Sequence, residues 1–183
     1  RPRAAIVIRE MTHARQLQLL ETRAALQELT VRLAAQRADV DERARMLQLA
    51  QAVEDAAAMS DGELYLRISR DIHHALYEAA RNEFLMGFMS SLYTLSRQFS
   101  FTHLREVDIP QAAAMHAAIL RAVAARSVPA AVAASQAMMA FLQAFTVDSR
   151  RNASARASKP LAKAARRNPS PATRSRTRDG NRA

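Results

Sequence analysis

Apolar residues recur at steps of three and four along most of this chain, with polar residues between them. That period is typical of amphipathic helices that bury one face in a core. The clearest stretch is 68–85, which contains neither glycine nor proline. The pattern predicts six helices within residues 11–146 and indicates no strand. The sequence therefore favours an all-α fold, an antiparallel bundle with short connections.

Between residues 11 and 82, polar residues that are typical of helix N-termini mark where each predicted helix begins. Leucines give residues 11–36 a broad apolar face, which predicts a long first helix. Asp39, with Glu42 three residues later, forms a capping box that predicts the start of the second helix. Residues 60–63 repeat that signal ahead of the third helix. Asn82 is expected to end the third helix and to cap the fourth.

Prolines mark the second part of the pattern. Residues 100–107 are mostly polar and are expected to form a loop. Pro110 and Pro129 predict the starts of the last two helices, because proline is tolerated in a first turn. The apolar pattern stops after Thr146. We therefore predict three segments: a linker at 1–10, a helical domain at 11–146 and a basic tail at 147–183.

The composition limits the function. The chain has 183 residues, of which 49% are hydrophobic, enough for one domain with a core. It has no cysteine, which excludes disulfides and thiolate metal sites. We find no apolar run near the ~20 residues of a membrane span and no signal peptide, and we expect a soluble, cytoplasmic protein. No phosphate loop, nucleophile motif or buried carboxylate pair indicates an enzyme.

The net charge of +10 is concentrated in the tail. Residues 147–183 hold 11 Lys or Arg and 2 Asp or Glu, a net of +9. With few apolar residues, this tail is expected to be disordered. It could bind nucleic acid in a salt-dependent way, or it could be a solvated overhang, and no aromatic residue interleaves the cations for base stacking. The candidate nucleic-acid contacts are Arg150, Arg151, Lys159, Lys163, Arg166 and Arg167.

One motif resembles a known family. Residues 74–82, His-Ala-Leu-Tyr-Glu-Ala-Ala-Arg-Asn, resemble the histidine-to-asparagine signature of the FCD domain, the ligand-sensing domain of FadR-branch GntR transcription regulators. Residues 19–27 resemble the first helix of that domain, and residues 116–122 resemble its second histidine helix. The resemblance covers nearly all of residues 11–146. It implies a helical bundle that binds a small organic acid in its interior.

The resemblance also implies a metal in some members, held by one aspartate and three histidines. In this sequence the aspartate position holds Arg70, and the last histidine position holds Met138. The other two positions hold His74 and His116. Because two ligands are missing and Arg70 would add a cation, we expect no cofactor. A divalent metal on the shifted set Asp71, His74 and His116 is the alternative.

The same positions suggest an anion pocket. Arg23 lies among leucines on the first apolar face, and His116 lies among alanines and Ile119, so both should point inward. Arginine binds carboxylates with two hydrogen bonds. We therefore expect Arg23, Arg70 and His116 to converge on a small carboxylate. His74 and Asn82 are further candidate ligand contacts.

Each of these residues also has a structural alternative. Arg23 could form a buried ion pair or cover apolar surface with its stem. His116 could be a core histidine with one hydrogen bond. His74 belongs to a polar stripe that is typical of a solvated helix face. Asn82 could serve only as a helix cap.

The resulting hypothesis is the effector-binding and dimerisation domain of a FadR-type GntR regulator. The resemblance implies a homodimer whose winged helix-turn-helix heads bind DNA. The residues before Met11 leave no room for such a head, so we expect a truncated product, a fragment or a headless relative. The alternative is a headless helical protein that binds nucleic acid non-specifically through its basic tail.

Overall fold

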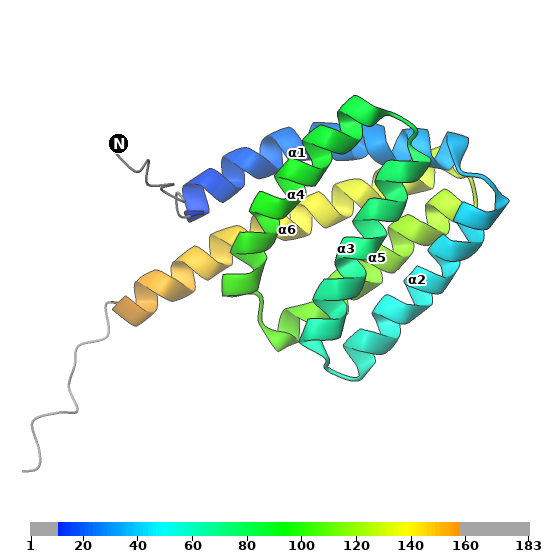
Figure 1. Cartoon of the computed structure of the whole chain (residues 1–183). Coiled ribbons are helices and arrows are strands. Elements are labelled where there is room, and N and C mark those ends of the chain that lie inside the picture. The colour runs from blue at the N-terminus through cyan, green and yellow to red at the C-terminus, as the bar shows by residue number, and fades with distance from the viewer. Residues whose placement is uncertain (1–10, 158–183) are drawn as a thin grey trace, which may run out of the picture.

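The computed structural model describes residues 11–157 and shows an all-α bundle, as predicted. Figure 1 shows α3 and α4 on one side of the bundle, with the long α6 passing behind them. No strand occurs within the described range. The elements are α1 (His13–Arg37), α2 (Val40–Ala58), α3 (Gly62–Ala79), α4 (Glu83–His103), the 3₁₀ helix η1 (Glu106–Asp108), α5 (Ile109–Ala124) and α6 (Val128–Ala157).

Polar caps start three of the helices where the sequence predicts them. Asp39 and Glu42 form the expected capping box at α2. Asp61, rather than Ser60, caps α3 by accepting the Leu64 N–H at 2.9 Å. Asn82 caps α4, where its Oδ1 accepts the Leu85 N–H at 3.0 Å. Each cap satisfies a backbone donor that has no partner inside the helix.

The core combines large aliphatic side chains with many alanines. Leu20, Ile72 and Leu120 are fully buried, which removes their apolar surface from water and stabilises the fold. Ala50 on α2 and Ala117 on α5 are also fully buried. Small side chains at such positions let α2 and α5 pack closely along most of their length.

An arginine pair closes one end of the bundle. Arg37 donates to the carbonyls of Ala80 and Arg81, and Arg81 donates to the carbonyl of Arg37. Arg81 also pairs with Asp39 and Glu42 at 3.1 and 3.0 Å. Its φ of 46° places it in the left-handed region that often ends a helix. The junction between α1 and α2 is thereby joined to the junction between α3 and α4.

The predicted loop at 100–107 is wrong in its first half, because α4 continues to His103. Phe99 is buried and stacks on the His103 ring with centroids 4.1 Å apart, so the last turn has an apolar anchor. After α4, Arg105 and Asp108 pair at 2.9 Å and hold η1. Asp108 therefore makes no side-chain cap to α5, although α5 starts as predicted.

Helix α6 is longer than predicted, since it runs to Ala157 rather than ending at Thr146. No proline or glycine lies between Pro129 and Pro160, and alanine and arginine favour helix. The expected disorder is therefore wrong for residues 147–157. The rest of the predicted tail, 158–183, lies outside the described residues, as does the predicted linker.

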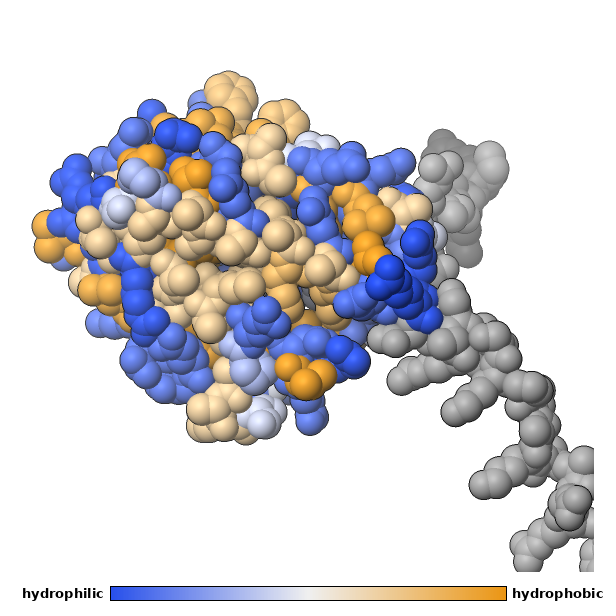
Figure 2. Space-filling model, turned by 180° about the vertical axis from the view of Figure 1, so that it is seen from behind, coloured by the Kyte–Doolittle hydropathy of each residue, from blue (hydrophilic) through white to orange (hydrophobic). Residues whose placement is uncertain are grey.

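Helix α6 is also more apolar than the sequence analysis recognised. Its segment Val128–Arg151 is long and apolar enough, by length and composition alone, to cross a membrane. In the bundle, α6 packs along α1 and α5, as a core helix does. Figure 2 shows a broad area of weakly hydrophobic side chains on the face opposite the view of Figure 1. Within residues 128–151 of α6, the exposed alanines are Ala130, Ala133, Ala137, Ala140 and Ala144.

We predict that Asn82→Ala lowers the free energy of unfolding by about 1 kcal/mol, because α4 loses its cap. Asn82→Asp is the matched control, since an aspartate oxygen can accept the same Leu85 N–H. Urea unfolding of the three proteins, followed by circular dichroism, measures the difference. Equal loss in both variants would show that the cap hydrogen bond does not stabilise α4.

Candidate functional site

A buried arginine lies in the centre of the bundle. Arg23 on α1 is only 3% exposed. Its Nη1 donates to Ser96 Oγ at 3.2 Å, and its Nη2 donates to His73 Nε2 at 2.7 Å. Its Nε is buried and has no hydrogen-bond partner. Among the described residues, no carboxylate pairs with Arg23. Burial lowers the pKa of Arg23, but a guanidinium remains protonated near neutral pH.

His73 on α3 holds this guanidinium from one side. Its Nε2 faces the Arg23 donor and must accept, so Nδ1 carries the proton and donates to the Ser69 carbonyl at 2.6 Å. The His73 ring stacks on Tyr93, with centroids 4.0 Å apart. Desolvation, followed by the charge of Arg23, holds the pKa of His73 well below its usual value. His73 is therefore a neutral acceptor that orients Arg23.

His116 on α5 lies near the same buried group of side chains, which is formed by Arg23, His73 and Ser96. It is 7% exposed, and its ring centroid lies 5.4 Å from that of His73. Its Nδ1 lies 3.4 Å from the Tyr65 hydroxyl. Burial, followed by the charge of Arg23, lowers the pKa of His116 to about 4. His116 is thus also neutral near pH 7, and the arginine carries the positive charge of this interior.

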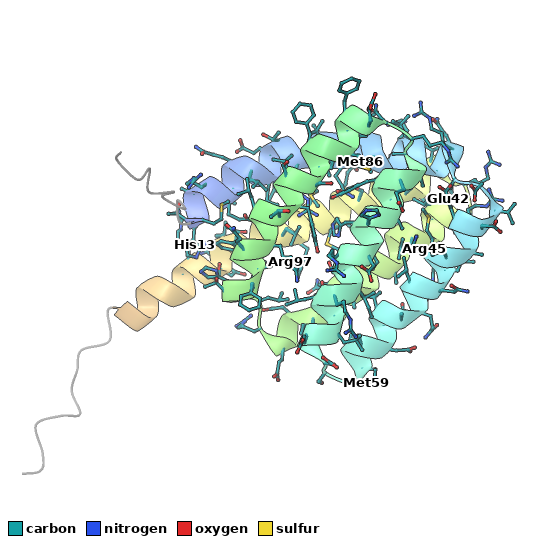
Figure 3. All side chains as sticks on the ribbon, in the orientation of Figure 1. His13, Glu42, Arg45, Met59, Met86 and Arg97 are labelled. Carbon is teal, nitrogen blue, oxygen red and sulfur yellow. The ribbon has the colours of Figure 1, made fainter. Side chains whose placement is uncertain are left out.

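A cavity of about 50 Å³ opens beside Arg23 and His116. Two arginines line it, Arg23 and the half-buried Arg97 of α4, and none of its described lining residues is acidic. Figure 3 shows Arg97 at the gap between α3 and α4, in front of α6. The remaining lining residues are Tyr65, Leu66, Ser69, Tyr93, Ser100, Leu104, Ala112, Met138, Phe141 and Leu142.

Several buried polar atoms on the helices that carry Arg23 and His73 have no hydrogen-bond partner within the described residues. Gln16 donates to Ser96 at 3.0 Å, but its Oε1 has no partner. Gln27 Oε1 and the Tyr77 hydroxyl are also buried without a hydrogen bond. Native interiors seldom leave such groups unpaired. Such atoms are candidates for hydrogen bonds to water or to a bound molecule.

The structure brings together two of the predicted ligand contacts, Arg23 and His116, but it places Arg70 elsewhere. Arg70 is exposed and pairs with Asp71 at 3.3 Å on the outer surface. The predicted convergence of Arg70 on the pocket is therefore wrong. The reason is the helical register, since the inward face of α3 carries Tyr65, Ser69 and His73 at steps of four.

The helical register also places His73, rather than the predicted His74, on the inward face of α3. His74 is exposed, and its Nδ1 pairs with Glu78 at 3.1 Å, so the predicted ligand role of His74 is wrong and the solvated-face alternative holds. His73 takes the interior position instead. Asn82 is half-buried, caps α4 and does not line the cavity, so the helix-cap alternative fits it.

The alternative metal set is not assembled. Asp71 and His74 lie on the outer surface, whereas His116 points into the bundle. Within the described part of the chain, no group of three or more His, Cys, Asp or Glu side chains could hold a metal ion. The inward-facing lone pair of His73 is occupied by the Arg23 donor.

The sequence pattern did not predict four residues of this interior, His73, Tyr93, Ser96 and Arg97. A signal existed for α4, where Ser96 follows Leu85, Met89 and Leu92 at helical spacing on one face and Arg97 is the next residue. Polar residues on an apolar helix face are expensive to bury unless they are paired or used. The same argument had identified Arg23.

The tail candidates lie at or beyond the end of the described helix. Arg150 and Arg151 are exposed on α6, and Arg151 pairs with Asp148 at 3.4 Å. Lys159, Lys163, Arg166 and Arg167 lie outside the described residues. Nucleic-acid binding by this segment stays a prediction.

Comparison with known proteins gives a family and a fold. The FCD domain model matches residues 18–141, which include α2 to α5 and most of α1. Among solved structures, E. coli McbR/YncC is similar, with a TM-score of 0.67 at 15% identity over 76% of this chain and 71% of that chain. A comparison with curated proteins gives no match.

The buried neutral histidines predict that stability falls in mild acid. A histidine in the unfolded chain titrates near ~6.5, whereas folded His116 titrates near about 4. Below pH ~6.5 the unfolded chain therefore binds more protons than the folded protein, and stability is lost as the pH falls toward 4. We expect roughly 1–2 kcal/mol of loss per buried histidine between pH 6.5 and 5.

Urea unfolding at both pH values checks this dependence. His116→Gln should remove about half of it. His74→Gln, which changes an exposed histidine, should keep most of it. An unchanged pH dependence in His116→Gln would mean that His116 is not held neutral in the folded protein.

Proposed function

Because the FCD model matches residues 18–141, the chain belongs to the FCD domain family, and we propose that it senses a small carboxylate within a FadR-type GntR transcription regulator. One observation carries this proposal, the buried Arg23 without an acidic partner among the described residues. A buried charge costs much free energy unless an opposite charge compensates it. A carboxylate effector supplies that charge.

The donors around Arg23 suit a carboxylate. Ser96 and His73 each accept one N–H of the guanidinium, which leaves its Nε–H and further N–H groups free to donate. A carboxylate can accept two of these hydrogen bonds at once. Tyr65 and Tyr93 line the same cavity, and a tyrosine hydroxyl can donate to a further oxygen.

The size of the cavity favours a small acid. A cavity needs roughly 10–15 Å³ to hold one water, so a volume of about 50 Å³ suits a small molecule rather than a long one. The cavity also borders half-buried Arg97 and Leu104, so a somewhat longer ligand can extend toward solvent.

We also propose that binding needs no metal. Arg23 contacts His73 and lines the cavity, so it already supplies the positive charge that a metal would give to the ligand. A divalent ion here would have to displace the Arg23 donor from His73 Nε2, which lies 2.7 Å away. It would also meet the repulsion of the guanidinium in a medium of low dielectric constant.

Helix α4 is suited to change position when a ligand binds in the cavity. Tyr93, Ser96 and Arg97 on its inner face line the cavity or hold Arg23. An anion that draws these residues inward shifts α4 against α1 and α3, the helices on which it packs. In the proposed regulator, this shift changes the placement of two DNA-binding heads.

The outer face of α4 is our candidate for the homodimer contact. Phe84 and Phe88 are 74% and 66% exposed, and Leu95 is 39% exposed two turns further on. Between Glu83 and Arg97, α4 carries no charged side chain. A second copy related by a two-fold axis could therefore pack on this face without opposing like charges.

The basic tail supports a separate candidate function, non-specific binding of nucleic acid. Its support is the net charge of +9 in residues 147–183, which would give an affinity that falls steeply with salt. This candidate needs no occupied cavity. A salt series with random duplex DNA tests it independently.

We predict that small carboxylic acids raise the melting temperature of the protein, with or without a chelator. Arg23→Gln should abolish this response because the ligand loses its counter-charge. The melting temperature of unliganded Arg23→Gln should stay the same or rise, because an uncompensated buried charge has been removed. A thermal-shift screen of acids measures both effects.

Arg70→Gln is the matched control, since it removes an exposed arginine from α3. It should respond to acids as the unaltered protein does. A response that persists in Arg23→Gln, or that disappears with chelator, would contradict the metal-free site.

We predict that Phe88→Glu converts the dimer to a monomer, because two copies of the new charge would face each other in the contact. Sedimentation at micromolar concentration measures the change. Val107→Glu is the control, since Val107 is 72% exposed but lies outside α4. A dimer that survives Phe88→Glu would place the contact elsewhere.

A further inference from the structure

The two arginines that line the cavity, Arg23 and Arg97, could each bind one carboxylate group. Resting on the proposed function, we infer that the effector is a short dicarboxylate, with one carboxylate on Arg23 inside the bundle and the other on Arg97 at the opening. This inference concerns the charge and length of the ligand. A ligand with a single carboxylate could bind at Arg23 without any contact to Arg97.

The charge of the cavity supports a dianion. Its thirteen described lining residues include two arginines and neither aspartate nor glutamate. His116, the only histidine among them, is buried beside Arg23, which favours its neutral form. A monocarboxylate would compensate one of the two positive charges. A dicarboxylate compensates both, which matters most where water is excluded.

Arg97 lines the cavity and can bind the second carboxylate of the ligand. It is half-buried on α4, and no ion pair or hydrogen bond to it occurs within the described part of the chain. It directly follows Ser96, which accepts from Arg23. The Arg23 Cζ lies 5.7 Å from the centroid of the Tyr93 ring. Burial raises the pKa of the Tyr93 hydroxyl, and the charges of Arg97 and Arg23, together with that of exposed Arg70, act against this larger effect.

The other walls of the cavity suit a short carbon chain. Six lining residues are apolar, and they provide surface for methylene groups between two charged ends. The volume of about 50 Å³ excludes long chains. We therefore expect acids of malonate to succinate length. The apolar residues are Leu66, Leu104, Ala112, Met138, Phe141 and Leu142.

Titration calorimetry on the full chain tests this inference, with each dicarboxylate matched to a monocarboxylate of the same carbon number. The pairs are malonate with propionate and succinate with butyrate, at constant pH and ionic strength. The better dicarboxylate should bind at least ~10-fold more tightly than its monocarboxylate, as expected for one further charge-assisted contact. Arg97→Gln should weaken the dicarboxylate by that factor and should weaken the monocarboxylate much less.

Arg70→Gln is again the control and should change neither affinity. Because Arg97 is half-buried and packs at the opening, Arg97→Gln should keep the melting temperature of the unliganded protein. Equal affinity for both members of each pair, with no effect of Arg97→Gln, overturns the dicarboxylate inference but leaves carboxylate binding at Arg23 intact. If neither class binds the unaltered protein, the proposed function fails as well.

Discussion

The contacts of Arg23 determine how the interior of this bundle is arranged. A guanidinium cannot shed its proton near neutral pH, so its charge must be accommodated wherever the helix places it. Here Ser96 and His73 accept two of its hydrogen bonds, and the His73 tautomer is fixed by this contact. These partners are neutral, and they orient the charge without cancelling it. The unliganded fold therefore retains an uncompensated charge at its centre, a stability cost that is typical of functional sites.

The same constraint explains why polar residues are distributed over four helices. Arg23 from α1 contacts His73 from α3 and Ser96 from α4, and it lines one cavity together with His116 from α5. No single helix carries the site, so its geometry depends on how the helices pack. Among the four, α4 has the most exposed large apolar side chains on its outer face, and its inner face lines the cavity. A ligand that pairs with Arg23 and a partner that covers α4 would therefore act on the same helix.

The sequence predicted the fold well because its local signals agree with one another. The caps at Asp39 and Asn82 and the prolines at the starts of α5 and α6 fixed most boundaries. Arg23 was recognisable as a charge on an apolar face. The two histidines of α3 were not separable, because neighbouring residues differ by only about 100° around a helix and both border the apolar face. Which one faces inward depends on how α3 packs against α1 and α4, and that is a tertiary property.

The inward position of His73, in place of the predicted His74, changes the chemistry of the site. A histidine that accepts a hydrogen bond from arginine cannot offer the same lone pair to a metal, so the basicity of His73 serves to orient Arg23. The second histidine, His116, is held neutral by burial and by the same arginine. The charge offered to a ligand thus comes from guanidinium groups alone, and it stays constant over the whole range in which imidazoles titrate. Arginine gives this cavity a fixed positive charge that neither chelation nor a moderate change in pH can remove.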